Sequence, residues 1–548
     1  MRAASLGILA LFTLSSCAPQ LAPPSNVVPR DNRPLPRQPK ARHPSLANEI
    51  LEMTFGYQLW QVFDSPRLIR RIAGRPYQAG NVDNFDEVPN SSWFTNRNGR
   101  RSLTIDEISR GPNVTGPPDA GGRWRVASMK SEGVTPGMTI IDRRGLRYII
   151  KFDHPNYPEL SSGTECVASR LLHAAGYNVP DNYVAHLDPD SLELDSAAVL
   201  KVATADKRDP IEQRVMTQAD LADMLRRANP GNGVVRVLAS LFLPGIPVGP
   251  WPYTGVRRDD PNDVFRHEHR REVRGLYVIA SWINHADMKE ENTLDAYDPV
   301  ARNLRHYLID FGAAMGSNST HPSHPRRGQA NSFDLKDSLT RLATLGLYVH
   351  DYERAPGTVR FPSVGYLETE LFKPDKWKPM YPVPAFENLT TRDAFWGAKI
   401  VTSFSDEQIA AAVSAGEFSD PAAAAYMVRF LIDRRDKIGR FWFSRINTID
   451  RVTTRGDTLI FADLAEERGY VEPGVSRYRY RVTGDSGEVL ERGRAESPSM
   501  VLDSGWRQHR FLAISLLPQR PNYRVDPVLV FVRPVEGGWE PIGIRRPH

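Results

Sequence analysis

The chain has 548 residues, which is too long for one ordinary hydrophobic core and indicates two or three domains. Apolar residues make up 41% of it and charged residues 25%, a composition typical of a folded protein and not of a disordered one. The 70 basic and 65 acidic residues nearly balance, and no basic tract is interleaved with aromatic residues, so the sequence does not favour a nucleic-acid-binding protein.

The N-terminus has the pattern of an export signal. Arg2 precedes an apolar run at 6–14, which is too short to span a bilayer and predicts a signal peptide over residues 1–16. The run ends in Leu-Ser-Ser-Cys, which resembles a bacterial lipobox with Cys17 as the lipidated residue. The alternative is a signal peptide that ends near a cysteine by chance. If Cys17 is lipidated, Cys166 is the only other cysteine, and no intramolecular disulfide can form.

The lipobox resemblance implies a location. In Gram-negative lipoproteins a residue other than Asp after the lipidated cysteine favours outer-membrane sorting, and this chain has Ala18 there. No later segment has the length and apolarity of a membrane-spanning helix, so the lipid is the one anchor that we expect. The sequence therefore predicts a lipid-anchored protein of the bacterial cell envelope, at the outer membrane and facing the periplasm.

The first part of the exported chain contains little regular structure. Residues 18–44 include eight prolines and no apolar periodicity, so we expect 17–44 to form an extended tether between the membrane and the folded part. Residues 45–120 are expected to be a helical and loop extension, with a helix from Leu46 to about Gly74.

Strands dominate the next segment, 121–245. We expect three antiparallel strands over 124–152, joined by a glycine turn at 133–137 and a second turn near 144. A helix with Ser162 as its N-cap follows them, and an apolar strand covers 234–245.

The segment 246–448 is predicted to be mostly helical, and 449–548 to be an all-β domain, most simply a sandwich. A long helix is expected from about 264 to 284, and helical structure again from about 335 to 445. The expected core residues of this second helical part are Leu339, Leu342, Leu345, Phe395, Ile400, Ile409, Phe430, Leu431 and Ile438.

A short polar run after the long helix carries the strongest signal in the chain. His285, Asp287, Lys289 and Asn292 fit the pattern H-x-D-x-K-x-x-N, and a strand that follows ends in Asp-Phe-Gly at 310–312. With the preceding order of strands and helices, these motifs resemble the protein-kinase-like superfamily. The nearest patterns are those of divergent members, the HipA-type kinases, the CotH kinases and the phosphatidylinositol kinases. The resemblance covers about residues 120–445 and is specific between 282 and 312.

This resemblance implies an α+β, bilobal kinase-like fold, with an N-lobe at 121–245 and a C-lobe at 246–448. It also implies ATP or another nucleotide with Mg²⁺ or Mn²⁺, because phosphoryl transfer depends on cations at the phosphate oxygens and on a positioned hydroxyl acceptor. Asp287 would orient the acceptor hydroxyl, and Lys289 would stabilise the transferred group. Asn292 and Asp310 would hold the metal.

The same resemblance assigns the nucleotide phosphates to the strand-rich segment. Lys151, on the third expected strand, would contact the α- and β-phosphates, and Glu165 on the following helix would orient it. The turn that contains Gly133 and Gly137 would offer backbone N–H groups to the phosphates. Simpler interpretations are a solvated strand lysine, a glutamate favoured by the helix dipole and a plain hairpin turn.

The sequence departs from protein kinases at two points. Ala286 takes the place of the arginine in H-R-D, and no A-P-E follows Asp310, so control through a phosphorylated loop is not expected. The segment after Asp310 is polar, and its part at 321–327 is expected to be a mobile loop, with a substrate or phosphate contact as the alternative.

A charged cluster precedes the polar run. His267 and His269, with nearby aspartates, could bind zinc, but on a helix they point to different faces, so a capped helix with a charged face is the preferred interpretation. Arg270, Arg271 and Arg274 are expected on a solvated helix face, with a bracing role for the catalytic loop as the alternative. No motif of a serine hydrolase or a zinc enzyme occurs.

Three functions fit the sequence. The first is an exported phosphotransferase that modifies a hydroxyl group of a protein, lipid or glycan. The second is a pseudokinase-type binding or scaffold lipoprotein, which the lack of an obvious ATP supply in the periplasm favours. The third is a structural envelope protein, which leaves the catalytic-loop pattern unexplained.

Overall fold

The computed structural model describes residues 21–42, 51, 54, 56–57, 64–120, 123–130, 137–203, 211–229, 231 and 233–547. Cys17 and Gly133, which the sequence singles out, lie outside these residues, as does the signal segment. The described part is a mixed α+β structure with four sheets. No helix in it combines the length and the apolarity that crossing a membrane requires.

The largest sheet has seven strands in the order β4-β7-β3-β2-β1-β5-β6. Burial alternates along β3, where Tyr148, Ile150 and Phe152 face a hydrophobic cluster that includes helix α6 (Gln218–Ala228). Lys151 therefore points to the opposite face. The strands are β1 (Trp124–Lys130), β2 (Gly137–Ile141), β3 (Arg147–Phe152), β4 (Asn182–Leu187), β5 (Leu192–Ala203), β6 (Ile211–Val215) and β7 (Val235–Leu241).

Helix α5 (Leu160–Ala175) covers that opposite face, where its Cys166 packs against Val184 and Leu238. The carboxylate of Asp153 accepts hydrogen bonds from the backbone N–H groups of Ser161 and Ser162 at 3.0 and 2.8 Å. The expectation that Ser162 caps this helix is therefore wrong, because a carboxylate from the preceding loop satisfies the free N–H groups.

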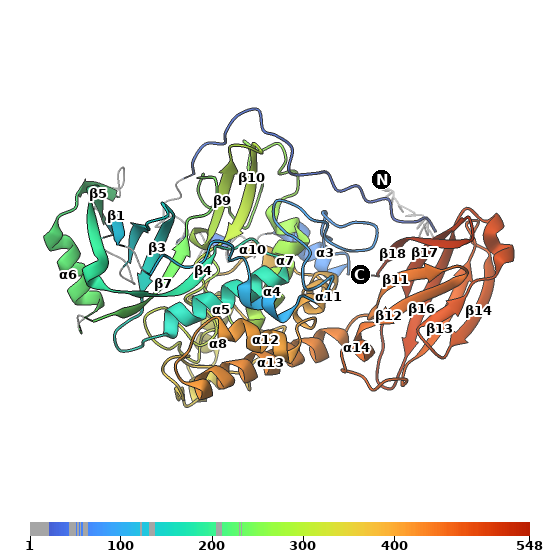
Figure 1. Cartoon of the computed structure of the whole chain (residues 1–548). Helices are drawn as coiled ribbons and strands as arrows, with labels where there is room; N and C mark the ends of the chain where they lie inside the picture. The colour runs from blue at the N-terminus through green and yellow to red at the C-terminus, as the bar shows by residue number, and fades with distance from the viewer. Residues whose placement is uncertain are drawn as a thin grey trace, which may run out of the picture.

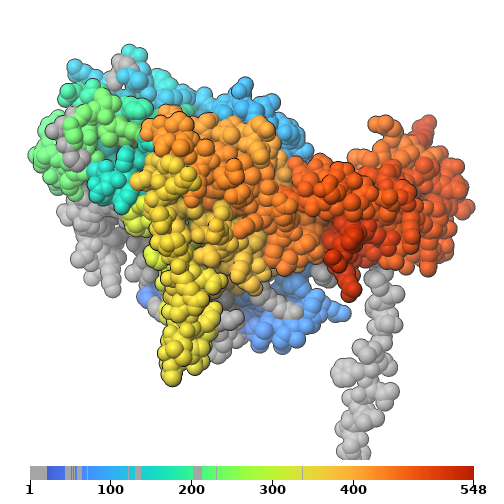
Figure 2. Space-filling view, turned by 90° about the horizontal axis from the view of Figure 1, so that it is seen from below, coloured from blue at the N-terminus to red at the C-terminus, as the bar shows by residue number. Residues whose placement is uncertain are grey.

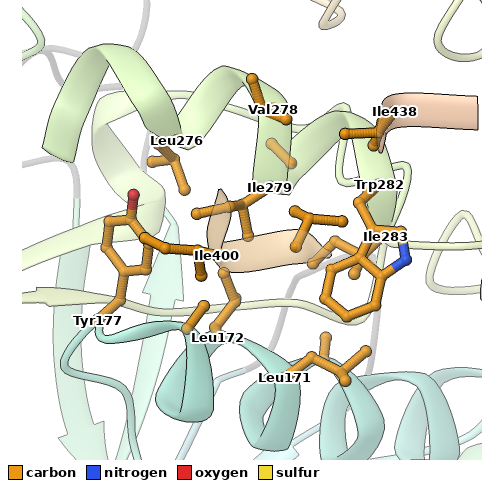
Figure 3. Packing of buried hydrophobic residues seen from close by; sticks show 14 of the residues in the cluster. Leu171, Leu172, Tyr177, Leu276, Val278, Ile279, Trp282, Ile283, Ile400 and Ile438 are labelled. Carbon is orange, nitrogen blue, oxygen red and sulfur yellow. The ribbon is translucent and has the colours of Figure 1, made fainter. Parts of the chain in front are cut away.

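Helix α7 (Arg271–Trp282) lies at the centre of the second, larger core, and every residue of it is buried. It is shorter than the expected helix from 264 to 284, because His267–His269 form a separate 3-10 turn (η3). Around it pack α5, α11 (Thr391–Val401) and α13 (Pro421–Phe443). In Figure 3, Leu171 and Leu172 of α5, Ile400 of α11 and Ile438 of α13 surround Leu276, Ile279 and Trp282 of α7.

A three-stranded sheet and several short helices complete the central part. The sheet has the order β10-β9-β8, and the turn η4 (Glu290–Asn292) precedes β9. Most of the expected core residues are buried, but Leu339, Leu342 and Leu345 are 57%, 72% and 89% exposed, so that part of the core prediction is wrong. The remaining elements are β8 (Ile246–Pro247), β9 (Thr293–Asp298), β10 (Asn303–Leu308), α4 (Ile105–Arg110), α8 (Leu335–Ala343), α9 (Asp351–Arg354), α10 (Pro384–Glu387) and α12 (Asp406–Ser414).

The C-terminal residues form two antiparallel sheets at one end of the molecule (Figures 1 and 2). Side chains from both sheets share one hydrophobic cluster that includes Leu459, Val482, Leu512 and Val530. The strands are β11 (Ile449–Arg455), β12 (Thr458–Asp463) and β15 (Ser499–Val501) in one sheet, and β14 (Val489–Ala495), β13 (Arg477–Thr483), β16 (Leu512–Gln519), β17 (Val528–Val535) and β18 (Gly538–Arg545) in the other, with α14 (Leu464–Glu467) between β12 and β13.

Residues 21–42 form a strap across the molecule, which we call the N-terminal strap (Figure 1). At one end, Arg545 of β18 donates a hydrogen bond of 2.5 Å to the carbonyl of Ala22. At the other end, Leu35 is buried, and the backbone N–H of Arg42 donates to the carbonyl of Val248 at 3.0 Å. The expectation of a free tether over 17–44 is thus wrong for 21–42, because its backbone groups find partners on the folded chain.

Candidate active site

Lys151, Glu165 and Asp310 lie together, although 159 residues separate the first from the last. The ammonium of Lys151 is 3.1 Å from Oδ1 of Asp310 and 3.9 Å from Oε2 of Glu165. Their placement follows from the fold, since Lys151 points from β3 to the sheet face that α5 covers, and α5 carries Glu165. The side chain of Glu165 is 3% exposed, whereas 50% of Asp310 is open to solvent.

The charges in this group depend on one another. Burial alone would lower the pKa of Lys151, but the carboxylates of Glu165 and Asp310 outweigh it and raise that pKa. The Lys151 ammonium in turn lowers the pKa of Asp310. Burial raises the pKa of Glu165, while Lys151 and the backbone N–H groups of Phe311 and Gly312 oppose that shift. At neutral pH a charged lysine therefore faces an ionised Asp310.

The backbone at Asp310 is in the left-handed region, with φ of +63°. This conformation is uncommon for a residue with a side chain and is concentrated at functional sites. Two residues later, a Cβ at Gly312 would lie 2.6 Å from Oγ of Ser161, so only glycine permits this approach of the segment to α5. The Asp-Phe-Gly turn is thus held against the helix that carries Glu165.

Asp287, Lys289 and Asn292 form the second half of the site. Oδ2 of Asp287 is 3.1 Å from the Lys289 ammonium and accepts a hydrogen bond of 3.1 Å from Nδ2 of Asn292. Burial lowers the pKa of Lys289, but Asp287 outweighs it, so the pKa is raised. The Lys289 charge also lowers the pKa of Asp310. The Lys289 ammonium is therefore attracted by the carboxylates of both Asp287 and Asp310.

Short backbone contacts hold the catalytic loop, residues 283–292, against the segment around Asp310. The N–H of Ile309 donates to the carbonyl of Asn292 at 3.0 Å, and the N–H of Met315 donates to the carbonyl of Ile283 at 2.7 Å. From a third segment, the N–H of Met380 donates to the carbonyl of Ala286 at 2.7 Å. Asn292 and Asp310, the two expected metal ligands, are therefore brought to adjacent backbone positions.

His285 packs inside the loop and does not face solvent. Its ring lies 5.7 Å from that of Phe311 in an edge-on arrangement, and both residues are buried. Burial lowers the pKa of His285 to about 4, so the imidazole is neutral at pH 7. His285 thus has a packing role between the catalytic loop and the Asp-Phe-Gly turn.

Arg434 of α13 hydrogen-bonds to the end of α7, from which the catalytic loop begins. Its buried guanidinium donates to the carbonyls of Ser281 and Trp282 at the C-terminus of α7, with Nε distances of 3.1 and 3.0 Å, and to the carbonyl of Glu368 at 2.8 Å. Two of these carbonyls lie at the C-terminus of α7, where a cation complements the helix dipole, and that of Ser281 also accepts from the N–H of Asn284 at 3.4 Å. The catalytic loop therefore begins at a helix end that Arg434 holds in place. The arginine of the H-R-D pattern cannot do this here, because Ala286 stands in its position.

Arg434→Met should lower the free energy of unfolding by roughly 2–3 kcal/mol, because it leaves buried carbonyls without donors. Urea denaturation followed by tryptophan fluorescence measures this loss. Arg429→Met is the matched control, since Arg429 is exposed on the same helix and its replacement should change stability by less than about 0.5 kcal/mol. Equal effects of the two variants would contradict the supporting role of Arg434.

Three arginines on the approach to the catalytic loop are buried, contrary to the expected solvated face. Arg270, Arg271 and Arg274 are 2%, 1% and 0% exposed. Arg271 contacts Asp86 at 2.6 Å and Asp393 at 3.0 Å, and Arg274 contacts Asp393 at 3.2 Å. These residues are charged and buried because carboxylates from distant segments pair with them. The expected solvated face is therefore wrong, and a bracing role for the catalytic loop stays a prediction.

The two histidines of the same segment do not form a metal site. Nε2 of His267 is 2.8 Å from Oδ2 of Asp263, and its ring packs edge-on against Trp93. Within the described ranges, no group of three His, Cys, Asp or Glu side chains is arranged to hold a metal ion. His267 and Asp263 instead belong to the buried ionic network.

The described part of the glycine turn is limited to Gly137. This residue opens β2 and is the direct cross-strand neighbour of Lys151. A Cβ at Gly137 would lie 2.8 Å from the carbonyl oxygen of Ile150, so glycine permits the close approach of the two strands. Gly133 lies outside the described residues.

Arg327 is a site residue that the sequence did not single out as such. Its segment, 321–327, was expected to be a mobile loop, but Arg327 donates to Sδ of Met380 at 2.9 Å and to Oδ1 of Asn318. Burial lowers its pKa, and the carboxylate of Asp287 opposes that shift, so the guanidinium faces the catalytic loop. In the sequence, Arg327 could have been found only through the alternative interpretation of 321–327 as a substrate or phosphate contact.

The oxygen atoms of the site suit a hard divalent cation. Asp310 has one carboxylate oxygen against Lys151 and half of its side chain exposed, and the buried Asn292 donates through its nitrogen to Asp287. The second oxygen of Asp310 and the amide oxygen of Asn292 are the kinds of ligand that Mg²⁺ and Mn²⁺ prefer. The residues present therefore fit such an ion.

Comparisons with known proteins identify no family. No family model matches the chain, and no curated protein matches it. Among solved structures, two of the Golgi casein kinase are similar, and one of these has Mn and ADP bound. Both are 12% identical to this chain, and both alignments cover 74% of it. They cover 95% of the first structure's chain and 94% of that of the structure with Mn and ADP, with TM-scores of 0.25 and 0.26. At such TM-scores the similarity carries no argument, so the function is argued from the site.

Proposed function

We propose that this chain is a kinase-like phosphotransferase that uses a nucleotide and a divalent metal to phosphorylate a hydroxyl acceptor. The observation that carries the proposal is the contact of Lys151 with both Asp310 and Glu165, beside the loop of Asp287, Lys289 and Asn292. A phosphate-binding cation, metal-binding oxygens and an acceptor-orienting carboxylate are the parts that phosphoryl transfer needs.

Each residue has a role in this proposal. Asp310 and Asn292 would hold the metal, which neutralises charge on the phosphates when it is bound. Lys151 would turn from Asp310 to the α- and β-phosphates and keep Glu165 as its partner. Asp287 would accept the proton of the acceptor hydroxyl, and Lys289, already beside it, would stabilise the transferred phosphoryl group.

Arg327 adds a further cation, which interacts electrostatically with Asp287. Its hydrogen bonds go to an amide oxygen and a thioether sulfur, both neutral. Its positive charge is therefore available to an anionic group. We assign to Arg327 a contact with the transferred phosphoryl group or with the acceptor.

The same proposal divides the central part of the chain into two lobes. The seven-stranded sheet with α5, within 121–245, corresponds to the N-lobe, and the helices around α7, within 246–448, correspond to the C-lobe. The two sheets of 449–548 form a separate sandwich domain. The sheet with α6 has one hydrophobic cluster, and the strands of 449–548 have another. Helix α5 instead contributes Leu171 and Leu172 to the cluster around α7, so it joins the two lobes.

A second candidate is a pseudokinase-type binding or scaffold lipoprotein. One observation favours it: the Lys151 ammonium lies 3.1 Å from one carboxylate oxygen of Asp310 and so neutralises the carboxylate that a metal ion would bind. If that ion pair is permanent, the site keeps its shape without binding a metal. The first candidate requires the pair to open when nucleotide and metal bind.

The location of the protein is also part of the proposal. The Leu-Ser-Ser-Cys sequence at 14–17 supports a lipid anchor at Cys17, and Ala18 supports the outer membrane of a bacterial envelope. An enzyme in the periplasm needs a phosphate donor that is exported there or made there. The nucleotide is therefore ATP or another donor available in that compartment.

Calorimetric titration of residues 18–548 with ADP and Mn²⁺ separates the two candidates. We expect saturable, Mn²⁺-dependent binding that weakens at least about tenfold in Lys151→Met, because a charge-assisted contact to phosphate is worth roughly 1.5–3 kcal/mol. Arg533→Met is the control, since Arg533 is an exposed cation that pairs with Glu540 in the C-terminal sheet, at 2.7 Å. Absence of binding to the parent chain would contradict the phosphotransferase and leave the scaffold.

A further inference from the structure

Two projections of the molecule carry exposed apolar side chains. The first is α8 with the turn that follows it, which we call the leucine tip. Its helix and turn are held by internal contacts of Asp337 with Arg341 and His350. The exposed fractions of its apolar side chains are Leu339 57%, Leu342 72%, Leu345 89%, Leu347 85%, Tyr348 44% and Val349 40%.

The second projection is helix α3 (Ser65–Ile72). Leu68, Ile69 and Ile72 on it are 55%, 64% and 79% exposed. The sequence from 65 to 82 contains four arginines and no acidic residue. A helix that presents aliphatic side chains together with arginines has the composition of an interfacial membrane helix.

Both projections extend from the same side of the molecule. In Figure 2 the yellow segment that contains α8 reaches beyond the body of the protein, and the blue segment that contains α3 lies on the same edge of the view. Single exposed apolar residues are ordinary, but six on one tip are an interaction surface. Because the tips are separate and convex, they suit a deformable layer better than a rigid protein partner.

We propose that the leucine tip and α3 form a membrane-contact face that inserts its apolar side chains into the surface of a bilayer with anionic lipids. Arg67 is paired with Glu387 at 3.3 Å, but Arg70 of α3 and Arg75 after it are exposed and match the charge of such lipids. Aliphatic side chains gain by leaving water. The lipobox-like sequence independently points to the same partner, since Cys17 lies only four residues before the strap begins. The face holds the protein in one orientation, a role that needs no catalysis.

Vesicle co-sedimentation tests this face. Residues 18–548 include every described residue and lack the apolar run at 6–14, which would itself bind lipid. We expect this chain to bind vesicles of phosphatidylethanolamine and phosphatidylglycerol, and to bind phosphatidylcholine vesicles several-fold more weakly. Combined replacement of Leu342, Leu345 and Leu347 by serine should lower the partition coefficient at least tenfold, and Arg70→Gln with Arg75→Gln should remove the preference for anionic lipid.

The control replaces three exposed valines away from the face, Val114, Val300 and Val501, by serine, and should change binding less than twofold. All variants alter exposed side chains, and unchanged circular dichroism verifies their folding.

Absence of vesicle binding by the parent chain, or equal binding by the leucine variant, would overturn the proposal. A parent dimer that becomes monomeric in the leucine variant, measured by sedimentation velocity, would instead assign the face to a second copy. Nucleotide titration is unaffected by any of these outcomes, so the proposed phosphotransfer is judged separately.

Discussion

Asp310→Asn is expected to lower the rate of phosphotransfer at least about 10³-fold while the chain remains folded. The loss of one transition-state charge contact costs roughly 10²–10³ in rate, and Asp310 would contribute through the metal as well as directly. The variant also removes the partner of Lys151. Because half of the Asp310 side chain is exposed, its loss leaves no deeply buried charge without a partner.

The measurement is nucleotide consumption at saturating Mn²⁺, with ATP and water as the acceptor, so that it does not depend on knowing the natural acceptor. Asp298→Asn is the matched control, since Asp298 is the last residue of β9 and its carboxylate accepts hydrogen bonds from the backbone N–H groups of Val300 and Ala301 in its own turn. Its rate should stay within twofold of the parent. If Asp310→Asn kept a tenth or more of the parent rate, the metal-binding role of Asp310 would be wrong.

Asp86→Asn is expected to lower the free energy of unfolding by about 3–5 kcal/mol, the cost of breaking a buried ion pair. Asp86 is 5% exposed and contacts Arg271 of α7 and Arg392 of α11 at 2.6 Å each, and Arg546 at 3.4 Å. Removing its charge leaves three arginines close together with fewer carboxylates to balance them. The exposed pair of Asp223 and Arg226, with side chains 51% and 67% exposed, provides the control, and Asp223→Asn should cost less than about 1 kcal/mol.

The effect should depend on pH in a defined direction. Burial by itself would raise the pKa of Asp86, but Arg271, Arg392 and Arg546 together hold it well below the usual range of an aspartate. A carboxyl group with a lowered pKa in the folded state stabilises fully above its unfolded pKa of about 3.9 and loses that effect as the pH falls through the folded pKa. The difference between parent and Asp86→Asn in urea denaturation should therefore be constant from pH 7 to about pH 5 and shrink below about pH 4. A difference that grows in acid would contradict this assignment.

The sequence was informative where chemistry imposes a local spacing. Asp287, Lys289 and Asn292 were identified because a loop that serves one site must carry its residues within a few positions of each other. Asp310 was expected from the Asp-Phe-Gly motif and Lys151 from the resemblance of its strand to that of the kinase lysine, and the two residues lie 3.1 Å apart. The roles of these residues remain predictions, but their convergence on one site could be expected from the motif.

The sequence was misleading where the partner of a residue is far away along the chain. Arg271 resembles a solvated helix residue until Asp86 and Asp393, 185 and 122 residues distant, are brought to it. Leu342 and Leu345 have the spacing of a core, yet in the described part of the chain they remain 72% and 89% exposed. Local periodicity reports which residues share a face and does not report what that face contacts.

The N-terminal strap has a consequence for the order of events during synthesis. The hydrogen bond from Arg545 to Ala22 joins residues 523 positions apart, and Pro24 packs beside Gly543. At about 5–20 residues per second, this partner appears on the order of a minute after the strap leaves the ribosome. Until then residues 22–24 lack this partner, whereas Asn26 can already bind Asp83 and Asn84. The strap is therefore fixed from its later residues toward its first ones. Completion of the last strand is the event that closes this interval.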